Sequence, residues 1–424
     1  MYAGKSGLIQ LTPFKLVLKL IKLRLKEIII KNSGFHSFFS GLVPLFILAH
    51  FTHHLLAALL IPLLPFIRDD FALDYTQAGW VASAFTLSYG ISQLPAGWLA
   101  DRIGPRILIT IGISGVALSG LLVGLSSTYI MVVLFLVLLG VTGGGYHPAS
   151  APLIAASVEP QNRGRALGLH QIGGTASHFL VPLIAVAVAA AWGWRGSFIG
   201  LAIPTIVFGL VFYVLLGRRG YTKKAESGMP SHTETLPTPG RLRRLVSFLI
   251  LSIAGQVLIV SVISFLPLFI VDHFGVGEEV AAGFLALVYA AGFWAGPLGG
   301  YLSDRLGRVP MLLAASAIAG PFLYLLNLAS YGWGIFAVLL IIGTTMYIRM
   351  PVSEAYIVSQ TSERKRSTIL GIYYFGSRGG PGVMTPVVGY LIDQVGIYST
   401  FTIMGATLVA VTLGCSIFLW GNRD

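Results

Sequence analysis

Three charged side chains lie deep within long apolar stretches of the sequence: Arg349, Glu354 and Arg378. An ionised group at the centre of a bilayer costs about 2.5–3.5 kcal/mol, so such groups face a protein interior or a watery cavity. Arg349 and Glu354 are five residues apart, roughly 140° around an ideal helix, which makes Arg378 the better partner for the carboxylate. We expect the two arginines to attract an anionic or polar solute and Glu354 to carry a proton. The alternative is an ion pair whose role is purely architectural.

Histidines form a second polar set in the first half of the chain. His50, His53 and His54 share one face of the first apolar stretch, because residues three and four apart are neighbours on a helix. Histidine titrates close to neutral pH, so we expect His50 and His54 to take part in proton coupling. The alternative is that each imidazole is a buried group that only forms hydrogen bonds. The expected lining of a central binding cavity consists of Arg349, Arg378, Gln171, His178, Tyr374 and His147.

Neither a metal site nor a cofactor is expected from these residues. His50 and His54 have the spacing of a metal-binding pair, but no cysteine or carboxylate on the same helix face completes the site. The glycine run at residues 143–145 follows no strand and precedes no Gly-Lys-Ser/Thr sequence, which excludes a nucleotide-binding loop. We find no nucleophile paired with a base, so an enzyme is not expected.

The composition is that of a membrane protein with helical spans. Of the 424 residues, 55% are hydrophobic and 10% are charged, whereas soluble proteins carry about 25% charged residues. These values exclude a soluble enzyme and a disordered chain. The apolar stretches are long and continuous, and helices are the spanning structure that such stretches can form. The twelve expected spans are residues 42–67, 76–99, 107–126, 129–157, 165–191, 195–217, 245–271, 279–302, 309–328, 331–360, 367–392 and 396–420.

The basic residues predict the orientation of the spans. The formal net charge is +12, and most Lys and Arg residues lie before the first span, in residues 218–244 and in alternate loops. By the positive-inside rule these segments and both termini are cytoplasmic, in a bacterial inner membrane, and nucleic-acid binding is not needed to explain the charge. Within residues 1–41, four lysines share one face of an amphipathic stretch that we expect to lie on anionic membrane lipid. The alternative is a cytosolic extension whose charges only fix the orientation.

The sequence contains an internal repeat with an offset of 203 residues. Residues 97–104, GWLADRIG, match residues 300–307, GYLSDRLG. Two parallel repeats of six helices imply two bundles related by an axis along the membrane normal. The expected organisation is a basic segment at 1–41, a first bundle at 42–217, a linker at 218–244 and a second bundle at 245–424.

The repeated Gly-x-Leu-x-Asp-Arg-x-Gly block resembles the signature that the major facilitator superfamily carries between helices 2 and 3 and between helices 8 and 9. The resemblance covers residues 42–420 and implies an all-α membrane protein with twelve transmembrane helices in two six-helix bundles. It also implies a monomeric secondary active transporter of a small solute that works by alternating access, and we expect proton coupling. We expect the glycines to allow close helix approach and the charges to latch the cytoplasmic gate, the alternative being a loop that only fixes orientation. The expected gating residues are Gly97, Asp101, Arg102, Gly104, Gly300, Asp304, Arg305 and Gly307.

A narrower resemblance is carried by His50-Phe51 and by the run from Gly144 to Pro148, which are similar to the fosmidomycin-resistance-like branch of the superfamily. Proton-driven efflux of amphipathic drugs is a competing hypothesis, and an uncoupled uniporter would have the same fold. The efflux hypothesis predicts an aromatic cavity, which could be formed by Tyr89, Tyr289, Trp294 and Tyr373.

Overall fold

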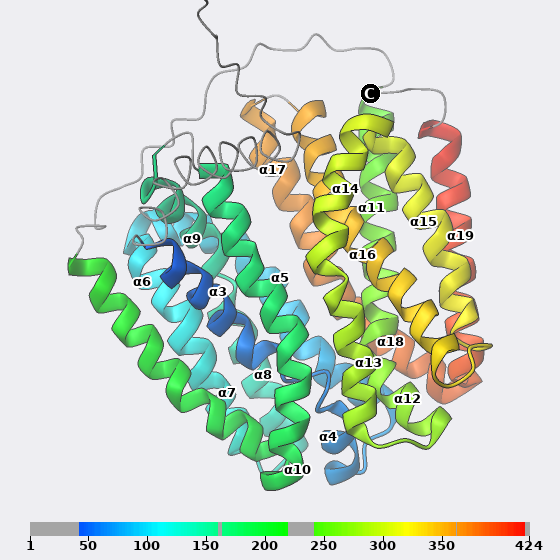
Figure 1. Cartoon of the computed structure of the whole chain (residues 1–424), viewed down its shortest axis with the longest axis horizontal. Coiled ribbons are helices and arrows are strands. Elements are labelled where there is room, and N and C mark those ends of the chain that lie inside the picture. Colours follow the sequence, from blue (N-terminus) through cyan, green and yellow to red (C-terminus); the bar gives the residue numbers. More distant parts are fainter. Residues whose placement is uncertain (1–41, 160–162, 219–240, 362, 420–424) are drawn as a thin grey trace, which may run out of the picture.

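The computed structural model describes residues 42–159, 163–218, 241–361 and 363–419. Every regular element in these ranges is a helix, and the helices form two groups (Figure 1). The amphipathic stretch predicted within residues 1–41, and nearly all of the linker predicted at 218–244, lie outside the described ranges.

The first group of helices starts with α3 and ends with α10. The start of α5 is fixed by a capping box, in which Asp74 accepts a hydrogen bond from the backbone N–H of Gln77 and the Gln77 side chain accepts one from the N–H of Asp74. The elements are α3 (Val43–Ala58), α4 (Leu64–Phe71), α5 (Tyr75–Ile103), α6 (Pro105–Thr110), the π-helical η1 (Ile111–Gly115), α7 (Val116–Gly124), α8 (Tyr129–Gly143), α9 (Tyr146–Ala156) and α10 (Arg163–Arg218).

The second group of helices starts with α11 and ends with α19. It also contains one π-helical segment, η3, between α17 and α18. The elements are α11 (Arg241–Ser264), α12 (Leu266–Phe274), α13 (Glu278–Ala290), α14 (Gly292–Leu306), α15 (Arg308–Leu325), α16 (Trp333–Gln360), α17 (Glu363–Tyr374), η3 (Phe375–Gly379), α18 (Gly380–Val395) and α19 (Ile397–Leu419).

The helix lengths are compatible with the twelve expected spans. Eight helical segments in the described ranges are long and apolar enough to cross a membrane. One of them, α10, has 56 residues and a sharp kink at Gly193 with φ 70°, so it can supply two spans. The remaining expected spans correspond to α3, to α5 and to the continuous run from α17 through α18.

The repeated sequence block has the same backbone conformation in both copies. α5 ends at Gly104 with a φ of 88°, and α14 ends at Gly307 with a φ of 94°. Residues with a side chain rarely adopt such angles, which explains glycine at both positions. The expected close helix approach at Gly104 is wrong, because a Cβ there would have no neighbour within 4 Å, and the same holds for Gly300. The surroundings of Gly97 lie outside the described side chains.

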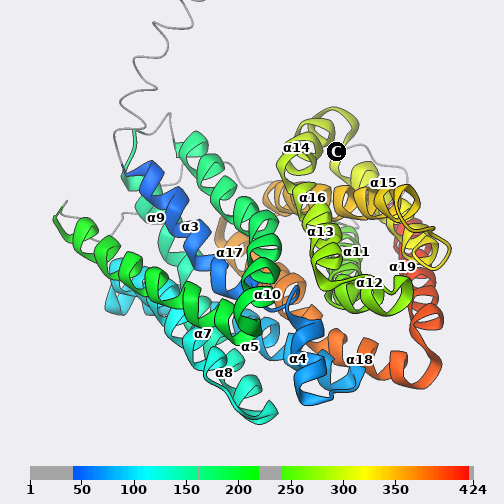
Figure 2. The same cartoon turned by 60° about the horizontal axis from the view of Figure 1, so that its bottom comes forward.

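The groups are joined mainly where α5 packs along α18 and where α10 packs along α13. Figures 1 and 2 show the groups side by side in both views. Glycine allows the close contact between α5 and α18, because a Cβ at Gly90 would lie 2.5 Å from the Cα of Gly379 and one at Gly382 would lie 2.5 Å from the backbone nitrogen of Leu87. Small residues at such contacts are typical of helix association in membranes.

One end of the molecule carries Asp272 and Asp393, and we call it the acidic end. Arg68, at the end of α4, donates from Nη1 and Nη2 to the two carboxylate oxygens of Asp272 on α12, at 2.5 and 2.9 Å. Asp393 on α18 accepts hydrogen bonds from the backbone N–H groups of Tyr75 and Thr76 on α5, at 3.1 and 2.8 Å. Charge-assisted hydrogen bonds therefore join the two groups of helices at this end.

The buried apolar side chains also differ between the acidic end and the opposite end. The largest apolar cluster is shared by both groups and includes Leu63, Val81, Phe265 and Phe269 near the acidic end. Toward the opposite end the described core separates into two clusters, one within each group. The groups thus share a core at the acidic end, whereas each has its own core at the other end.

Candidate functional site

Six imidazoles gather inside the first group of helices, and we call them the histidine cluster. The rings of His50 and His170 are stacked with centroids 4.1 Å apart, and the ring of His54 lies 4.9 Å from those of both His50 and His178. Of the histidines in the described ranges, only His273 lies elsewhere. The members are His50, His53 and His54 from α3, His147 from α9, and His170 and His178 from α10.

Hydrogen bonds fix the neutral tautomers of His50 and His53. Nδ1 of His50 lies 2.8 Å from the carbonyl oxygen of His170, and because a carbonyl can only accept, Nδ1 carries the hydrogen and Nε2 a lone pair. Nδ1 of His53 donates in the same way to the carbonyl of Gly112 at 2.6 Å, and its Nε2 faces the Tyr89 hydroxyl at 3.5 Å. Nε2 of His50 has no hydrogen-bond partner among the described residues, although the side chain is only 2% exposed.

Irregular helix geometry positions several of these side chains. Gly112 belongs to η1, and π-helical segments occur frequently at functional sites. The helical path is interrupted between α8 and α9 at Gly144 and Gly145, where Cβ atoms would lie 1.9 Å from Ser92 Oγ and 2.5 Å from Leu108 Cδ1. His147 follows this interruption in the first turn of α9. The glycines therefore admit the neighbouring helices and place His147 opposite α3.

α10 supports the cluster from the other side. A Cβ at Gly174 would lie 2.6 Å from the imidazole of His50, so a glycine lets α10 approach α3 this closely. One turn earlier, the His170 carbonyl accepts the hydrogen bond from His50, and Nε2 of His170 lies 3.1 Å from the hydroxyl of Tyr146. The ring of Tyr146 is fully buried and extends the stack of rings.

The second group of helices contributes Arg378, which lies in η3. The neighbouring residue Gly379 contacts Gly90 on α5, so η3 is held against the helix that lines the cluster. Nη2 of Arg378 lies 3.6 Å from the sulfur of Met350. No carboxylate among the described side chains forms an ion pair with Arg378 within 4 Å. Its positive charge is therefore available to an anion.

The expected ion pair between Glu354 and Arg378 is not formed. Glu354 instead accepts a hydrogen bond from the hydroxyl of Tyr374 at 2.9 Å. Tyr374 is the last residue of α17, directly before η3, and its side chain extends to α16, which carries Glu354. Gln171, which the 203-residue offset aligns with Tyr374, is exposed on α10.

The cluster and the second group meet at His178 and Tyr289, whose ring centroids are 5.3 Å apart. Thr175, one turn before His178 on α10, lies against Gly292, where an added Cβ would be 3.0 Å from its methyl group. The structure thus brings His178, His147, His50 and His54 together and places Arg378 on the facing helices.

Arg349 lies elsewhere, inside the second group of helices, and is 1% exposed. Nη1 donates to Ser316 Oγ at 2.6 Å, and Nη2 donates to the carbonyls of Leu251 and Ser252 at 2.8 and 3.2 Å. Gly255 makes room for the guanidinium, because a Cβ there would lie 1.8 Å from Nη2. These contacts leave no surface of Arg349 for a ligand in this conformation.

The expected gating residues lie at the end opposite the acidic end, which we call the basic end. Arg102 stacks on the ring of Trp98 at 4.3 Å, and Arg305 stacks on the ring of Tyr301 at 4.4 Å. The two contacts are related by the 203-residue offset. Asp304 lies 4.0 Å from Arg308, while the side chain of Asp101 is not among those described.

Sequence reasoning missed several residues that the structure places at important positions. Tyr146 contacts the histidine cluster, and its adjacency to His147 in the sequence was an available signal. Tyr89, which was named only for an aromatic drug cavity, contacts the cluster through His53. Arg68 and Asp272 were interpreted only as charges of the loops opposite the basic ones, and Asp393 was not singled out. No sequence signal pairs them, because their partners are about 200 or more residues away along the chain.

An apolar groove of about 380 Å³ lies on α10 near its kink, lined by Val188, Trp192 and Gly196 among others. It contains none of the clustered histidines, and Trp192 is 74% exposed. We therefore do not assign the solute site to this groove.

The sequence model of the Major Facilitator Superfamily matches residues 46–348 and 279–424. The chain belongs to the Major Facilitator Superfamily. Its relatives in the superfamily include a probable sulfoacetate transporter of Cupriavidus necator, which is 27% identical over 84% of this chain and 87% of the relative. The fosmidomycin resistance protein of Escherichia coli is 24% identical over 90% of this chain and 93% of that protein.

A solved structure of the same fold is that of a POT family transporter in complex with a thioalcohol-conjugated peptide. It has a TM-score of 0.75 and 14% identity, and the match covers 89% of this chain and 95% of that one. The chain is thus an integral membrane transporter of the Major Facilitator Superfamily and not an enzyme, as the sequence predicted.

Proposed function

We propose that the chain moves a small anionic or polar organic solute across a bacterial inner membrane by alternating access. The observation that carries the proposal is Arg378, a cation without a carboxylate partner on the helices that face the histidine cluster. An ionisable residue at membrane depth is a binding-site hypothesis by default. The sulfoacetate named for one relative is an organic anion, which supports the same substrate class.

The two six-helix bundles, 42–217 and 245–424, would rock about the site between the histidine cluster and Arg378. In this conformation Arg68, Asp272 and Asp393 hold the acidic end closed, and the core is divided toward the basic end. With the basic end in the cytoplasm, as the positive-inside rule predicts, the conformation is closed to the outside.

Glu354 is the proposed proton carrier, together with His50 and His54. The carboxylate lies deep in α16, is partly exposed and has one hydrogen-bond donor, Tyr374, which can hold it in either protonation state. Gln171, His147, His178 and Tyr374 are the proposed polar lining. Arg349 is better interpreted as a structural residue, because both terminal nitrogens of its buried guanidinium donate hydrogen bonds, to Ser316 and to two carbonyls.

The proposal also keeps two features of the basic residues and the repeated block. The lysine face within residues 1–41 would rest on anionic lipid. Asp101, Arg102, Asp304 and Arg305 would close the basic end when the acidic end opens.

Transport in proteoliposomes tests the substrate class. A panel of small organic anions that includes sulfoacetate, and a panel of lipophilic cations, would be measured with the wild type, with Arg378→Gln and with Arg195→Gln. Arg195 carries the same charge at the acidic end, where it pairs with Asp70. We expect saturable anion transport that Arg378→Gln abolishes and Arg195→Gln preserves. Cation transport that is indifferent to Arg378 would favour drug efflux instead.

A pH-sensitive dye inside the same vesicles tests the coupling. We expect proton movement upon addition of the transported anion, and loss of that movement in Glu354→Gln. An anion that moves without protons would identify a uniporter and overturn the coupling assignment.

A further inference from the structure

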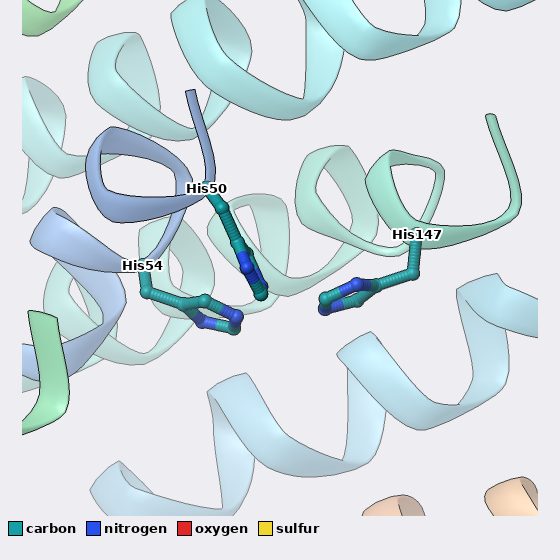
Figure 3. A group of neighbouring side chains, drawn as sticks. All are labelled: His50, His54 and His147. Atoms are coloured by element: carbon teal, nitrogen blue, oxygen red, sulfur yellow. The ribbon is translucent and has the colours of Figure 1, made fainter. Parts of the chain in front are cut away.

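Three members of the histidine cluster have the arrangement of a metal site. One ring nitrogen from each of His50, His54 and His147 lies within 4.8 Å of the other two. Figure 3 shows the three rings converging from α3 and α9. We propose that His50, His54 and His147 together bind one divalent transition-metal ion, such as Zn²⁺ or Co²⁺. The third ligand comes from another helix, which is why the sequence indicated only the pair on α3.

His50 is already prepared as a ligand. Its Nδ1–H donates to the carbonyl of His170, so the lone pair is on Nε2, and ligating histidines have an outer hydrogen bond of this kind. Nε2 has no partner in the described structure, and neither has Nε2 of His147. Buried polar atoms without a partner are uncommon, and a bound ion would satisfy both nitrogens.

The geometry requires only a small contraction. Three atoms that are at most 4.8 Å apart lie no more than about 2.8 Å from a common centre, whereas a Zn–N bond is about 2.0–2.1 Å long. His54 and His147 form no side-chain hydrogen bond in the described structure, so their rings can rotate toward the centre. His50 is the fixed member of the set.

The donor atoms select the class of ion. Imidazole nitrogens suit zinc, cobalt, nickel and copper, whereas magnesium and calcium require oxygen ligands. Three histidines leave one position open in a tetrahedral site. Because the three ligands are neutral and Arg378 is nearby, an anion is the electrostatically favoured fourth ligand. This last step rests on the proposed function, whereas metal binding itself does not. While the ion is bound, the lone pairs of His50 and His54 are occupied, and Glu354 alone carries the proton.

Metal binding to the purified full-length protein tests the proposal directly, without transport. The protein would carry an affinity tag that lacks histidine, and His36 and His232 would be changed to asparagine in every variant, because they lie outside the described residues. Co²⁺ would be titrated while its visible d–d absorption is recorded, and bound metal would be counted by mass spectrometry after dialysis. We expect one ion per chain with the spectrum of a tetrahedral site.

Single variants identify the ligands. We expect at least about tenfold weaker Co²⁺ binding in each of His50→Asn, His54→Asn and His147→Asn. Loss of a group that only hydrogen-bonds a metal ligand already weakens binding about tenfold or more, and these variants remove a ligand itself. His178→Asn removes an imidazole from the same cluster but not from the three-nitrogen set, and should bind Co²⁺ as the parent does. Failure of the parent to bind Co²⁺ at millimolar concentration, or equal binding by all four variants, would overturn the proposal.

Thermal unfolding of the unmutated protein gives a second measurement in case a variant does not fold. An ion that binds only the folded state raises the unfolding temperature. We expect Zn²⁺ to raise it and Mg²⁺ to leave it unchanged. No shift with Zn²⁺ at saturating concentration contradicts the site. Metal binding with no transport of any anion would leave the site intact and reject the proposed function alone.

Discussion

Arg68 and Asp272 are 204 residues apart in the chain, yet two parallel hydrogen bonds of 2.5 and 2.9 Å join their side chains. Arg68 lies in the last turn of α4 in the first group of helices, and Asp272 lies near the end of α12 in the second. Tyr75 donates a further hydrogen bond to the same carboxylate. The acidic end is therefore held by a bidentate pair that exists only when the two groups are close.

Asp272→Asn should weaken the closed state of the acidic end. The pair is partly buried, with Arg68 17% and Asp272 33% exposed, so solvent screens part of the attraction between the charges. We expect the substitution to reduce the free energy that favours the closed state by about 1–2 kcal/mol. A loss of that size changes the ratio of open to closed molecules by a factor of about 5–30. Distances between spin labels on the loops that follow α4 and α12 measure the populations, in a Cys415→Ser background.

Asp69→Asn is the matched control for this substitution. Asp69 also contacts Arg68, at 3.1 Å, but it is 62% exposed and belongs to the same helix. The control should leave the label distances unchanged. Equal effects of both substitutions would mean that the charge of the loop, and not the contact between groups, holds the acidic end.

Closure of the acidic end should also weaken at alkaline pH through Tyr75. Burial and, next, the hydrogen bond to Asp272 raise the pKa of the Tyr75 phenol above its usual value near 10. If opening restores the usual pKa, the open state releases a proton above pH 10 that the closed state retains. Rising pH then favours opening, whereas below about pH 10 this contribution to closure is complete and constant.

Spin-label distances recorded from pH 7 to 11 measure this dependence. Tyr75→Phe should reduce the alkaline opening, because the titrating phenol is gone. Asp272 also raises the pKa of the Arg68 guanidinium, so Arg68 stays charged over the whole range and does not contribute to the change. An alkaline transition that is identical in Tyr75→Phe would assign it to another group.

Gly174→Ala should disturb the histidine cluster. The new methyl group would lie 2.6 Å from the ring of His50, which the His170 carbonyl holds in place. We expect the added atom to displace the ring and to lower both transport and Co²⁺ affinity, by about tenfold for the metal. Gly168→Ala, on the same helix with no atom within 4 Å, is the control and should change neither. Unchanged Co²⁺ affinity in Gly174→Ala would show that the ring can move without loss.

Arg349 and Arg378 should respond differently to loss of charge. Arg349→Met removes a buried guanidinium with three hydrogen bonds and should destabilise the fold by about 2 kcal/mol or more. Arg378→Met should abolish anion transport while the unfolding temperature changes little, because Arg378 has no ion-pair partner to lose. Thermal unfolding and anion uptake of both variants make the comparison. A stable Arg349→Met protein with weakened anion affinity would return Arg349 to the binding site.

Much of the fold could be predicted because membrane depth restricts what a sequence can form. The apolar runs predicted helices, and α16 and α19 begin and end within two residues of the predicted spans. The repeated block predicted two structurally similar halves, and the structure gives Gly104 and Gly307, at equivalent positions of the two copies, nearly the same φ angle. Gly104 and Gly300 were misinterpreted as contact residues, because a sequence does not distinguish a backbone requirement from a packing requirement.

The site was predictable only in part, because contacts between helices are not encoded by local spacing. His50 and His54 were identified from their shared helix face, and Arg378 from its depth in an apolar span. The predicted partner of Glu354, Arg378, was wrong, because Tyr374, the residue directly before η3, donates a hydrogen bond to the carboxylate instead. Arg349 was grouped with Arg378 by residue type, although its guanidinium is directed into the second group of helices.

The sequence by itself determined the helical membrane architecture, the internal repeat and the superfamily, because hydropathy, charge placement and a repeated motif are local properties of the chain. Only the tertiary structure decided that His147 joins His50 and His54, that Arg68 reaches Asp272, and that the acidic end is closed. These contacts bring together residues that are roughly 100 to 200 positions apart, and such pairs depend on how glycine, π-helical turns and helix packing rotate each side chain in space.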